Sequence, residues 1–277
     1  MAGIVVVFDF DKTIIDCDSD NWIVDELGLS QSFKQLLPTV PFNSLMDRMM
    51  MELHSKGKTI EEIAECLRKV PLPSNIVSAI KSAHSFGCDL RILSDANVFF
   101  IETILEHHGL LDCFSEINTN PSLVDEGGRL RIFPYYDFKA SCHGCKICPP
   151  NMCKGLVMEK IRSSLPARGT KRFIYLGDGG ADFCAGLKLE EKDYLMPRKN
   201  FPLWEIIRSK PELVKAEVQE WCDGAEFQRT LLHLINKISI EENCRVESDQ
   251  LVATDCKSHT SSVPTLEHFQ SALPVPY

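Results

Sequence analysis

The feature that most constrains the fold is an apolar, β-branched run at residues 4–8 that ends in two aspartates, Asp9 and Asp11. Such a run predicts a strand buried on both faces, as in the middle of a parallel sheet. Side chains alternate along a strand, so both aspartates should point to the same side where it ends. In open α/β sheets, ligands bind in the crevice beyond the carboxyl ends of the strands. Two carboxylates aimed into that crevice favour a hard divalent cation, most simply Mg²⁺.

A second apolar run, residues 172–176, ends in the same way. Gly177 follows it, and then come Asp178 and Asp182 with small residues between them that allow a tight turn. An ordinary acidic turn is the simpler interpretation of either pair alone, because short motifs recur by chance. Two such strands side by side, however, predict an oxygen-rich magnesium site at one edge of the sheet.

Two further residues offer groups that a phosphate needs. Ser94 follows an expected strand over 89–93 and precedes an expected helix over 98–108, where a hydroxyl and the N–H groups of a helix start favour an anion. Lys154 opens a later helix and would place a positive charge beside a phosphoryl group. Simpler interpretations remain open: Ser94 or Asn97 caps the helix, and Lys154 is solvated surface.

The order of the expected elements predicts an α/β protein with an inserted helical cap. Residues 16–70 have helical periodicity, and a capping-box pattern begins at Thr59. This block interrupts a strand–helix–strand unit, so we expect a cap over a core made of residues 1–15 and 71–239. The periodicity then fades, and we expect residues 240–277 to form a disordered polar tail.

Composition limits the function classes. A chain of 277 residues with 44% hydrophobic content can bury one large core. The formal net charge of −9 argues against a nucleic-acid-binding surface. The opening has no basic segment, and no stretch approaches the roughly 20 apolar residues of a membrane span. Twelve cysteines without an export signal indicate reduced thiols. We therefore expect a soluble cytoplasmic protein with no nucleic-acid or membrane partner.

Several cysteines are crowded into one short segment. Cys142, Cys145, Cys148 and Cys153, with His143 beside them, are residue types that ligate zinc. Structural zinc sites normally use two separated pairs of ligands, so reduced loop thiols are the simpler interpretation. The sequence leaves the choice open.

Two more acids lie close to the expected site. We expect Asp20 and Asp95 to bind the substrate, as partners of a cationic head group. Trp22 and Phe42 would add a cation–π contact if they face inward. Solvation of the acids and packing of the aromatic rings are the simpler alternatives.

The segments described above occur in an order that resembles the four motifs of the haloacid dehalogenase (HAD) superfamily of phosphatases. They are Asp9-Phe10-Asp11-Lys12-Thr13, Ser94, Lys154 and residues 177–182. The resemblance covers about residues 4–238 and implies a Rossmann-like parallel sheet with a cap. Lys12 stands where glycine or glutamate is often found.

Further segments are similar to the phosphoethanolamine/phosphocholine phosphatase family and its plant relatives. These segments are residues 16–20, 94–97, 148–154 and 196–200. Plant members are known as phosphoethanolamine/phosphocholine, inorganic pyrophosphate and thiamine phosphate phosphatases. The resemblance therefore indicates the reaction class more narrowly than the substrate.

The resemblance also implies a role for each matched residue. Asp9 would be the nucleophile that becomes an aspartyl-phosphate, and Asp11 would act as general acid and then as general base. Ser94 and Lys154 would hold the phosphoryl oxygens.

The same resemblance implies a set of metal ligands. The Asp9 carboxylate, the Asp11 backbone carbonyl and Asp178 would hold Mg²⁺, with Asp182 in support.

The leading hypothesis is a Mg²⁺-dependent phosphatase that hydrolyses a small soluble phosphorylated metabolite of the phosphoethanolamine, phosphocholine or thiamine monophosphate type. Inorganic pyrophosphate is the alternative substrate. A binding protein that keeps the fold without turnover, and a phosphotransferase, are the alternative classes. The sequence predicts no oligomeric state.

Overall fold

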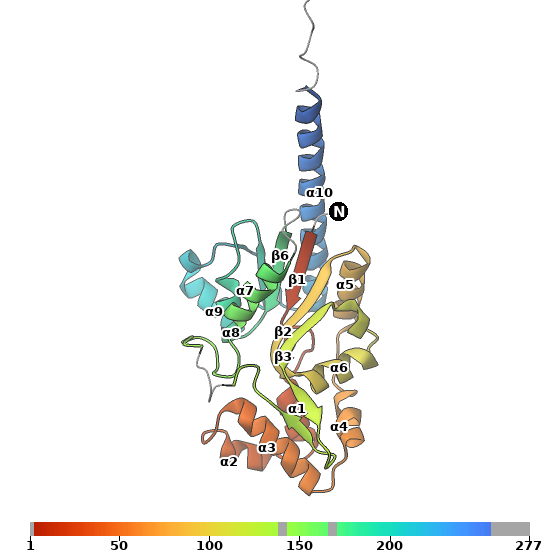
Figure 1. Ribbon diagram of the computed structural model, residues 1–277, viewed down its shortest axis with the longest axis vertical. Helices are drawn as coiled ribbons and strands as arrows, with labels where there is room; N and C mark the ends of the chain where they lie inside the picture. Colours follow the sequence, from red (N-terminus) through yellow and green to blue (C-terminus); the bar gives the residue numbers. More distant parts are fainter. Residues whose placement is uncertain (1–2, 138–142, 166–170, 256–277) are drawn as a thin grey trace, which may run out of the picture.

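A parallel sheet forms the centre of the computed structural model, which describes residues 3–137, 143–165 and 171–255 (Figure 1). The strand order is β3-β2-β1-β6-β7-β8, and each neighbouring pair is parallel. The strands are β1 (Gly3–Phe8), β2 (Asp89–Asn97), β3 (Glu116–Asn120), β6 (Lys171–Gly177), β7 (Tyr194–Pro197) and β8 (Glu217–Val218). The parallel α/β sheet that the sequence predicted is confirmed.

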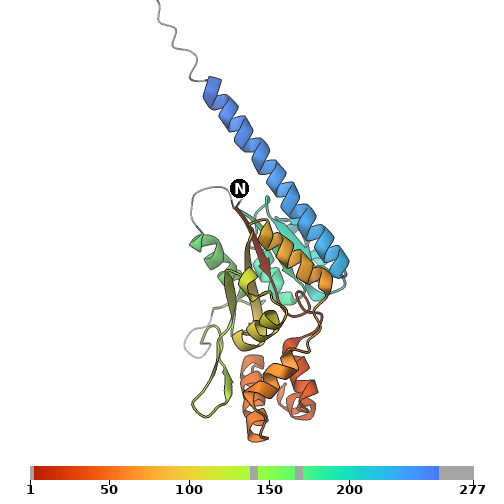
Figure 2. The ribbon, with the colours of Figure 1, turned by 90° about the vertical axis from the view of Figure 1, so that its right-hand side faces the viewer.

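The first strand is buried on both faces, as its uninterrupted apolar run predicted. Val6 and Phe8 belong to the larger of two apolar clusters, whereas Val5 and Val7 point into the other. Helices cover both faces, as Figures 1 and 2 show. Those beside the larger cluster are α5 (Ser74–Ser85), α6 (Val98–His107) and α10 (Gly224–Asp255); those beside the other are α7 (Lys154–Ser164), α8 (Gly180–Gly186) and α9 (Pro202–Ser209). Short 3₁₀ turns, η1 (Leu111–Cys113) and η2 (Pro211–Leu213), connect elements of the core.

Four helices lie between β1 and α5 in the sequence. They are α1 (Ser19–Glu26), α2 (Ser30–Leu36), α3 (Phe42–Ser55) and α4 (Ile60–Leu67). In Figure 1 they lie beyond the end of the sheet toward which the strand arrows point. The hairpin of β4 (Ser122–Val124) and β5 (Leu130–Ile132) packs against α3. The helices predicted within residues 16–70 are present, and the division into core and cap stays a prediction.

A salt bridge joins the hairpin to α3. Arg131 of β5 donates two hydrogen bonds to Asp47 of α3, at 2.8 and 2.9 Å. The backbone N–H of Ile132 donates to the same carboxylate at 3.0 Å. Charged bidentate pairs of this kind are among the stronger hydrogen bonds, and this one holds the hairpin against α3.

Local signals predicted several helix starts well. The side chain of Thr59 accepts a hydrogen bond from the backbone N–H of Glu62, and the Glu62 carboxylate accepts one from the backbone N–H of Thr59. The capping box is therefore confirmed. Asn97 accepts from Phe100 N at 3.2 Å and caps α6. Capping is therefore the role of Asn97, which leaves Ser94 outside the helix start.

The last helix differs from the prediction. Helix α10 continues to Asp255, so residues 240–255 are helical and the boundary of the predicted tail at 240 is wrong. Charged and amide residues that favour helix continue after the apolar periodicity ends, and a helix that is already nucleated extends at low cost. Residues 256–277 lie outside the described residues. Among the described helices, none combines the length and apolar character that crossing a bilayer requires.

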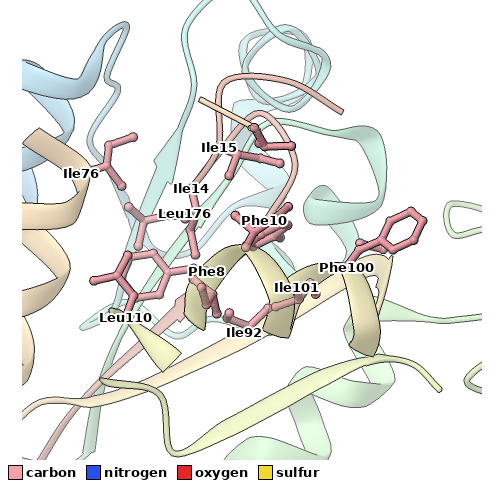
Figure 3. Packing of buried hydrophobic residues seen from close by; sticks show 14 of the residues in the cluster. Phe8, Phe10, Ile14, Ile15, Ile76, Ile92, Phe100, Ile101, Leu110 and Leu176 are labelled. Carbon is pink, nitrogen blue, oxygen red and sulfur yellow. The ribbon is translucent and has the colours of Figure 1, made fainter. Parts of the chain in front are cut away.

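Phe8 provides a test of the larger apolar cluster. Its ring is fully buried, stacks on Phe227 of α10 at 6.2 Å and meets Phe114 edge-on at 5.9 Å. Figure 3 shows it among the other apolar side chains of the cluster. Phe8→Ala should lower the free energy of unfolding by about 3–5 kcal/mol because it leaves a cavity.

Urea denaturation followed by circular dichroism measures this loss. The matched control is Phe86→Ala, whose side chain is 58% exposed and should change stability by less than about 0.5 kcal/mol. Equal losses in the two variants would contradict the assigned packing.

Candidate active site

The carboxyl edge of the sheet brings together acids that are far apart in the sequence. Phe8 pairs with Leu176 in register, and the N–H of Asp9 continues the ladder by donating to the Leu176 carbonyl at 2.9 Å. Asp9 and Asp178 therefore follow neighbouring strands at the same level, and both are buried. One carboxylate oxygen from each of Asp9, Asp178 and Asp182 lies within 4.8 Å of the other two. The predicted meeting of the acids is thus present in the structure.

Lys154 enters this group from the first turn of α7. Its ammonium lies 2.8 Å from Asp9 Oδ1 and 2.7 Å from Asp182 Oδ1, and its side chain is 3% exposed. Burial lowers the pKa of Lys154, but the carboxylates of Asp182, Asp9 and Asp95 outweigh burial and hold that pKa well above its usual value. Lys154 is therefore a charged group of the site, and its alternative interpretation as solvated surface is wrong.

Asp182 has no free acceptor position. Its Oδ1 accepts from Lys154 Nζ and from the Tyr175 hydroxyl at 2.6 Å. Its Oδ2 accepts from the backbone N–H groups of Asp178 at 3.1 Å and Gly179 at 2.8 Å. An ionised carboxylate offers about four lone-pair positions, and four donors occupy them here. Asp182 therefore holds Lys154 and the turn that carries Asp178.

Asp9 and Asp178 carry the excess negative charge of the site. Burial, and then the charge of Asp182, raise the pKa of Asp9 well above its usual value although Lys154 opposes them. The same two causes raise the pKa of Asp178 to about 6. Three acids facing one lysine favour a bound cation, and a hard divalent ion with oxygen ligands such as Mg²⁺ fits this donor set.

Asp11 lies in the loop between β1 and α1. Its carboxylate accepts from Ser19 N at 2.9 Å. Burial, and then the charge of Asp18, raise the pKa of Asp11 to about 7. A carboxyl group with such a pKa exchanges a proton readily near neutral pH, as general acid–base chemistry requires.

The backbone between the two loop aspartates and α1 turns sharply. Lys12 has a φ of 56°, in the left-handed region that favours glycine. Its carbonyl accepts from Arg198 Nη1 at 2.7 Å, and Arg198 Nη2 reaches Asp16 at 2.5 Å. The glycine often found at the position of Lys12 matches this conformation, and Arg198 supports the turn here.

Ser94 belongs to β2, which pairs with β1 on the side opposite β6. Phe8 pairs with Ile92, so the end of β2 reaches the same edge as Asp9. Ser94 is buried, and its Oγ accepts from Ala96 N at 3.2 Å, which leaves its hydroxyl hydrogen available to a ligand. The expected strand end is displaced, because β2 runs on to Asn97.

A cavity of about 160 Å³ lies between α1, α3 and the ends of β2 and β3. Asp20 and Asp95 line it, as do Phe42 and the buried Asn97, whose Nδ2 has no partner within the described residues. Burial, and then the charge of Asp11, raise the pKa of Asp20 well above its usual value, and no cation lowers it. The two acids predicted to bind substrate therefore share one cavity.

The two predicted aromatic partners differ. Phe42 lines the cavity, whereas Trp22 packs against the core and donates from Nε1 to the Cys66 carbonyl at 3.1 Å. Packing is therefore the role of Trp22.

An asparagine network that the sequence did not predict supports Asp95. Asn151 donates to Asp95 Oδ1 and to Asn120 Oδ1, both at 3.1 Å. Asn120 donates in turn to the carbonyls of Asp95 at 2.6 Å and Ala96 at 2.9 Å. Single asparagines in loops carry no spacing signal, so only the fold identifies them. The only indication in the sequence that Asn151 lies near the site was its position three residues before Lys154.

The comparisons with known proteins agree with this geometry. A family model described as Putative Phosphatase matches residues 4–235. The chain is 58% identical over 256 residues to inorganic pyrophosphatase 2 of Arabidopsis thaliana, a match that covers 92% of each chain. It is 58% identical over 244 residues to a thiamine phosphate phosphatase-like protein of the same plant, covering 88% of this chain and 100% of that protein.

A solved structure shares the fold. The phospho-aspartyl intermediate analogue of phosphoserine phosphatase matches with a TM-score of 0.51 at 15% identity, over 80% of this chain and 96% of that chain. The family model spans most of the chain, and the residues of the four motifs converge on one edge of the sheet. The chain therefore belongs to the putative phosphatase family, and it is a HAD-type phosphatase.

Proposed function

We propose that the protein is a Mg²⁺-dependent phosphatase of small metabolites that carry both a phosphate and a cationic head group. The observation that carries the first part is the convergence of Asp9, Lys154 and Asp178 in a buried site. The acid-lined cavity nearby carries the second part.

Asp9 is placed to act as the nucleophile. Its carboxylate oxygen attacks phosphorus, the bond from phosphorus to the leaving oxygen breaks, and Asp11 gives its proton to that oxygen. Asp11 then takes a proton from water, the resulting hydroxide attacks the aspartyl-phosphate, and the bond between phosphorus and Asp9 breaks to release inorganic phosphate. The raised pKa of Asp11 suits both proton transfers.

Lys154 and Ser94 neutralise and orient the phosphoryl oxygens during these steps. The Asp9 and Asp178 carboxylates and the Asp11 backbone carbonyl would hold Mg²⁺. The ion, when bound, supplies positive charge that stabilises the developing negative charge on the phosphoryl group. Asp182 positions Lys154 and the Asp178 turn through its four hydrogen bonds.

The cavity supports a cationic head group. Asp20 is a buried carboxyl group with no hydrogen-bond donor or cation beside it in the described part of the chain. Phe42 adds an aromatic face to the same wall. An amine, a quaternary ammonium or a thiazolium group would offset the burial cost of Asp20 and contact the ring.

Inorganic pyrophosphate is the second candidate substrate. The 58% identity to inorganic pyrophosphatase 2 favours it. The cavity disfavours pyrophosphate, because the carboxyl groups of Asp20 and Asp95 would repel a polyanion. A binding protein without turnover is the weakest alternative, since the residues of all four motifs are present and Asp9 and Lys154 are in direct contact. We also propose a cytoplasmic location, which the free thiols of the nine cysteines with described side chains support.

Asp9→Asn tests the covalent mechanism. The amide is not a nucleophile for phosphorus, so kcat/KM for p-nitrophenyl phosphate with Mg²⁺ should fall by about 10³-fold or more. Asp112→Asn, an exposed change far from the site, should leave the rate unchanged, and EDTA should abolish it in the wild type. Substantial turnover by Asp9→Asn would remove the aspartyl-phosphate from consideration.

Asp178→Asn and Asp182→Asn separate a metal ligand from a positioning residue. Asp178→Asn should raise the Mg²⁺ concentration for half-maximal activity by about tenfold or more, because it removes an ionised ligand. Asp182→Asn should lower kcat by displacing Lys154 and change the Mg²⁺ requirement less than about threefold. A shift in Mg²⁺ requirement as large as that of Asp178→Asn would make Asp182 a ligand instead.

Asp20→Asn tests the head-group cavity. With phosphocholine and phosphoethanolamine, KM should rise about tenfold or more because a charged partner is lost, whereas KM for pyrophosphate should stay level or fall. Asp25→Asn, on the exposed face of the same helix, is the matched control. A wild-type enzyme that turns over pyrophosphate far faster than either amine ester would replace the proposed substrate class and leave the catalytic site as assigned.

A further inference from the structure

Four cysteines from two separate parts of the chain meet beside the active site. Cys145, Cys148 and Cys153 come from the segment before α7, and Cys184 comes from α8. Their four Sγ atoms lie within 4.8 Å of one another. The sequence identified the first three and missed Cys184, which is 31 residues further along. Cys142, which the sequence grouped with them, lies outside the described residues.

The spacing between the sulfur atoms matches a single tetrahedral metal ion. Cys145 Sγ is 3.7 Å and Cys153 Sγ is 3.9 Å from Cys184 Sγ. A zinc–sulfur bond of about 2.3 Å in a tetrahedron separates the sulfur atoms by about 3.8 Å. A disulfide would need about 2.05 Å, and all four of these cysteines are free thiols.

The backbone around Cys145 is shaped as a thiolate support. The N–H groups of Ile147 and Cys148 both point to Cys145 Sγ, at 3.4 and 3.5 Å. Donors aimed at a ligand sulfur orient it and stabilise its negative charge. The close approach of α7 completes the site: a Cβ on Gly155 would lie 2.6 Å from Cys184 Sγ, so only glycine lets the two helices meet here.

His143 is not part of this cluster. Its Nδ1 accepts from Cys145 N at 3.1 Å, and its Nε2 lies 2.9 Å from the Pro149 carbonyl. Both ring nitrogens are therefore used in shaping the loop. His143, which the sequence placed among the possible zinc ligands, is therefore outside the cluster, and Cys184 is its fourth member.

We propose that Cys145, Cys148, Cys153 and Cys184 bind one structural Zn²⁺ ion. Four protein ligands leave no open coordination position, so the ion holds the structure and performs no chemistry of its own. The site is independent of the identity of the substrate.

The ion would hold together the two helices that carry Lys154 and Asp182. Cys153 directly precedes Lys154, and Cys184 follows Asp182 by two residues, so the bound ion ties the start of α7 to α8. The two helices carry the partners of the 2.7 Å salt bridge between Lys154 and Asp182. Cys148 also precedes Asn151, which reaches the substrate cavity through Asp95.

Metal content of the whole protein is the direct test. Wild-type chain, produced in zinc-supplemented medium, purified under reducing conditions and desalted exhaustively, should contain about one zinc per chain by mass spectrometry of the metal. Replacement of zinc by Co²⁺ should give the intense thiolate-to-cobalt charge-transfer absorption and the visible bands of a tetrahedral site. Cobalt at the carboxylate site would give no thiolate band, so the spectrum distinguishes the two sites.

Cysteine variants locate the metal. Cys145→Ser and Cys184→Ser should each lose most of the zinc, whereas Cys88→Ser, the same change at a buried cysteine elsewhere, should keep it. Asp178→Asn should also keep it, because the carboxylate site is separate. If the ligand variants do not fold, the wild-type stoichiometry and the cobalt spectrum still decide. Wild type with less than about 0.1 zinc per chain and no thiolate–cobalt band, iron in place of zinc, or zinc retained by folded Cys184→Ser would overturn the proposal.

Discussion

The whole site depends on the buried ammonium of Lys154 between the carboxylates of Asp9 and Asp182. An isolated charge at this depth would cost several kcal/mol, and it is stable only because two short ionic contacts replace its water. Those contacts join the end of β1, the start of α7 and the start of α8. The network is therefore both the centre of the candidate active site and a constraint on how these three elements pack.

This network holds more negative than positive charge, because three carboxyl groups surround one lysine. Lys154 neutralises one carboxylate, Asp182 is saturated by four donors, and Asp9 and Asp178 keep the remaining negative charge. A bound divalent cation would restore the balance and, in the proposed mechanism, would favour the ionised form of Asp9. The cavity next to the site has a similar charge imbalance, because Asp20 is a buried acid with no cation beside it among the described residues. In the proposed function, catalysis and selectivity both depend on acids whose negative charge the protein itself leaves uncompensated.

The central strands could be predicted because their signal is local. An uninterrupted β-branched run requires burial on both faces, and aspartates directly after it mark the carboxyl edge, so β1, β6 and the positions of Asp9 and Asp178 followed from the sequence. The caps at Thr59 and Asn97 were equally local. The predicted end of the ordered chain at residue 240 was wrong. Apolar periodicity indicates only which part of a helix is buried, and α10 continues as a helix after that periodicity ends.

The sequence by itself determined the order of the central strands and helices along the chain and the acids of the site, and through its motifs it indicated the reaction class, since these depend on residue types within a few positions. Only the tertiary structure decided which partners those residues have. Tyr175 completes the shell of Asp182, Asn151 and Asn120 hold Asp95, and Cys184 joins Cys145, Cys148 and Cys153. The physical reason is that such contacts join elements tens of residues apart, and their geometry exists only once the helices have packed against the sheet.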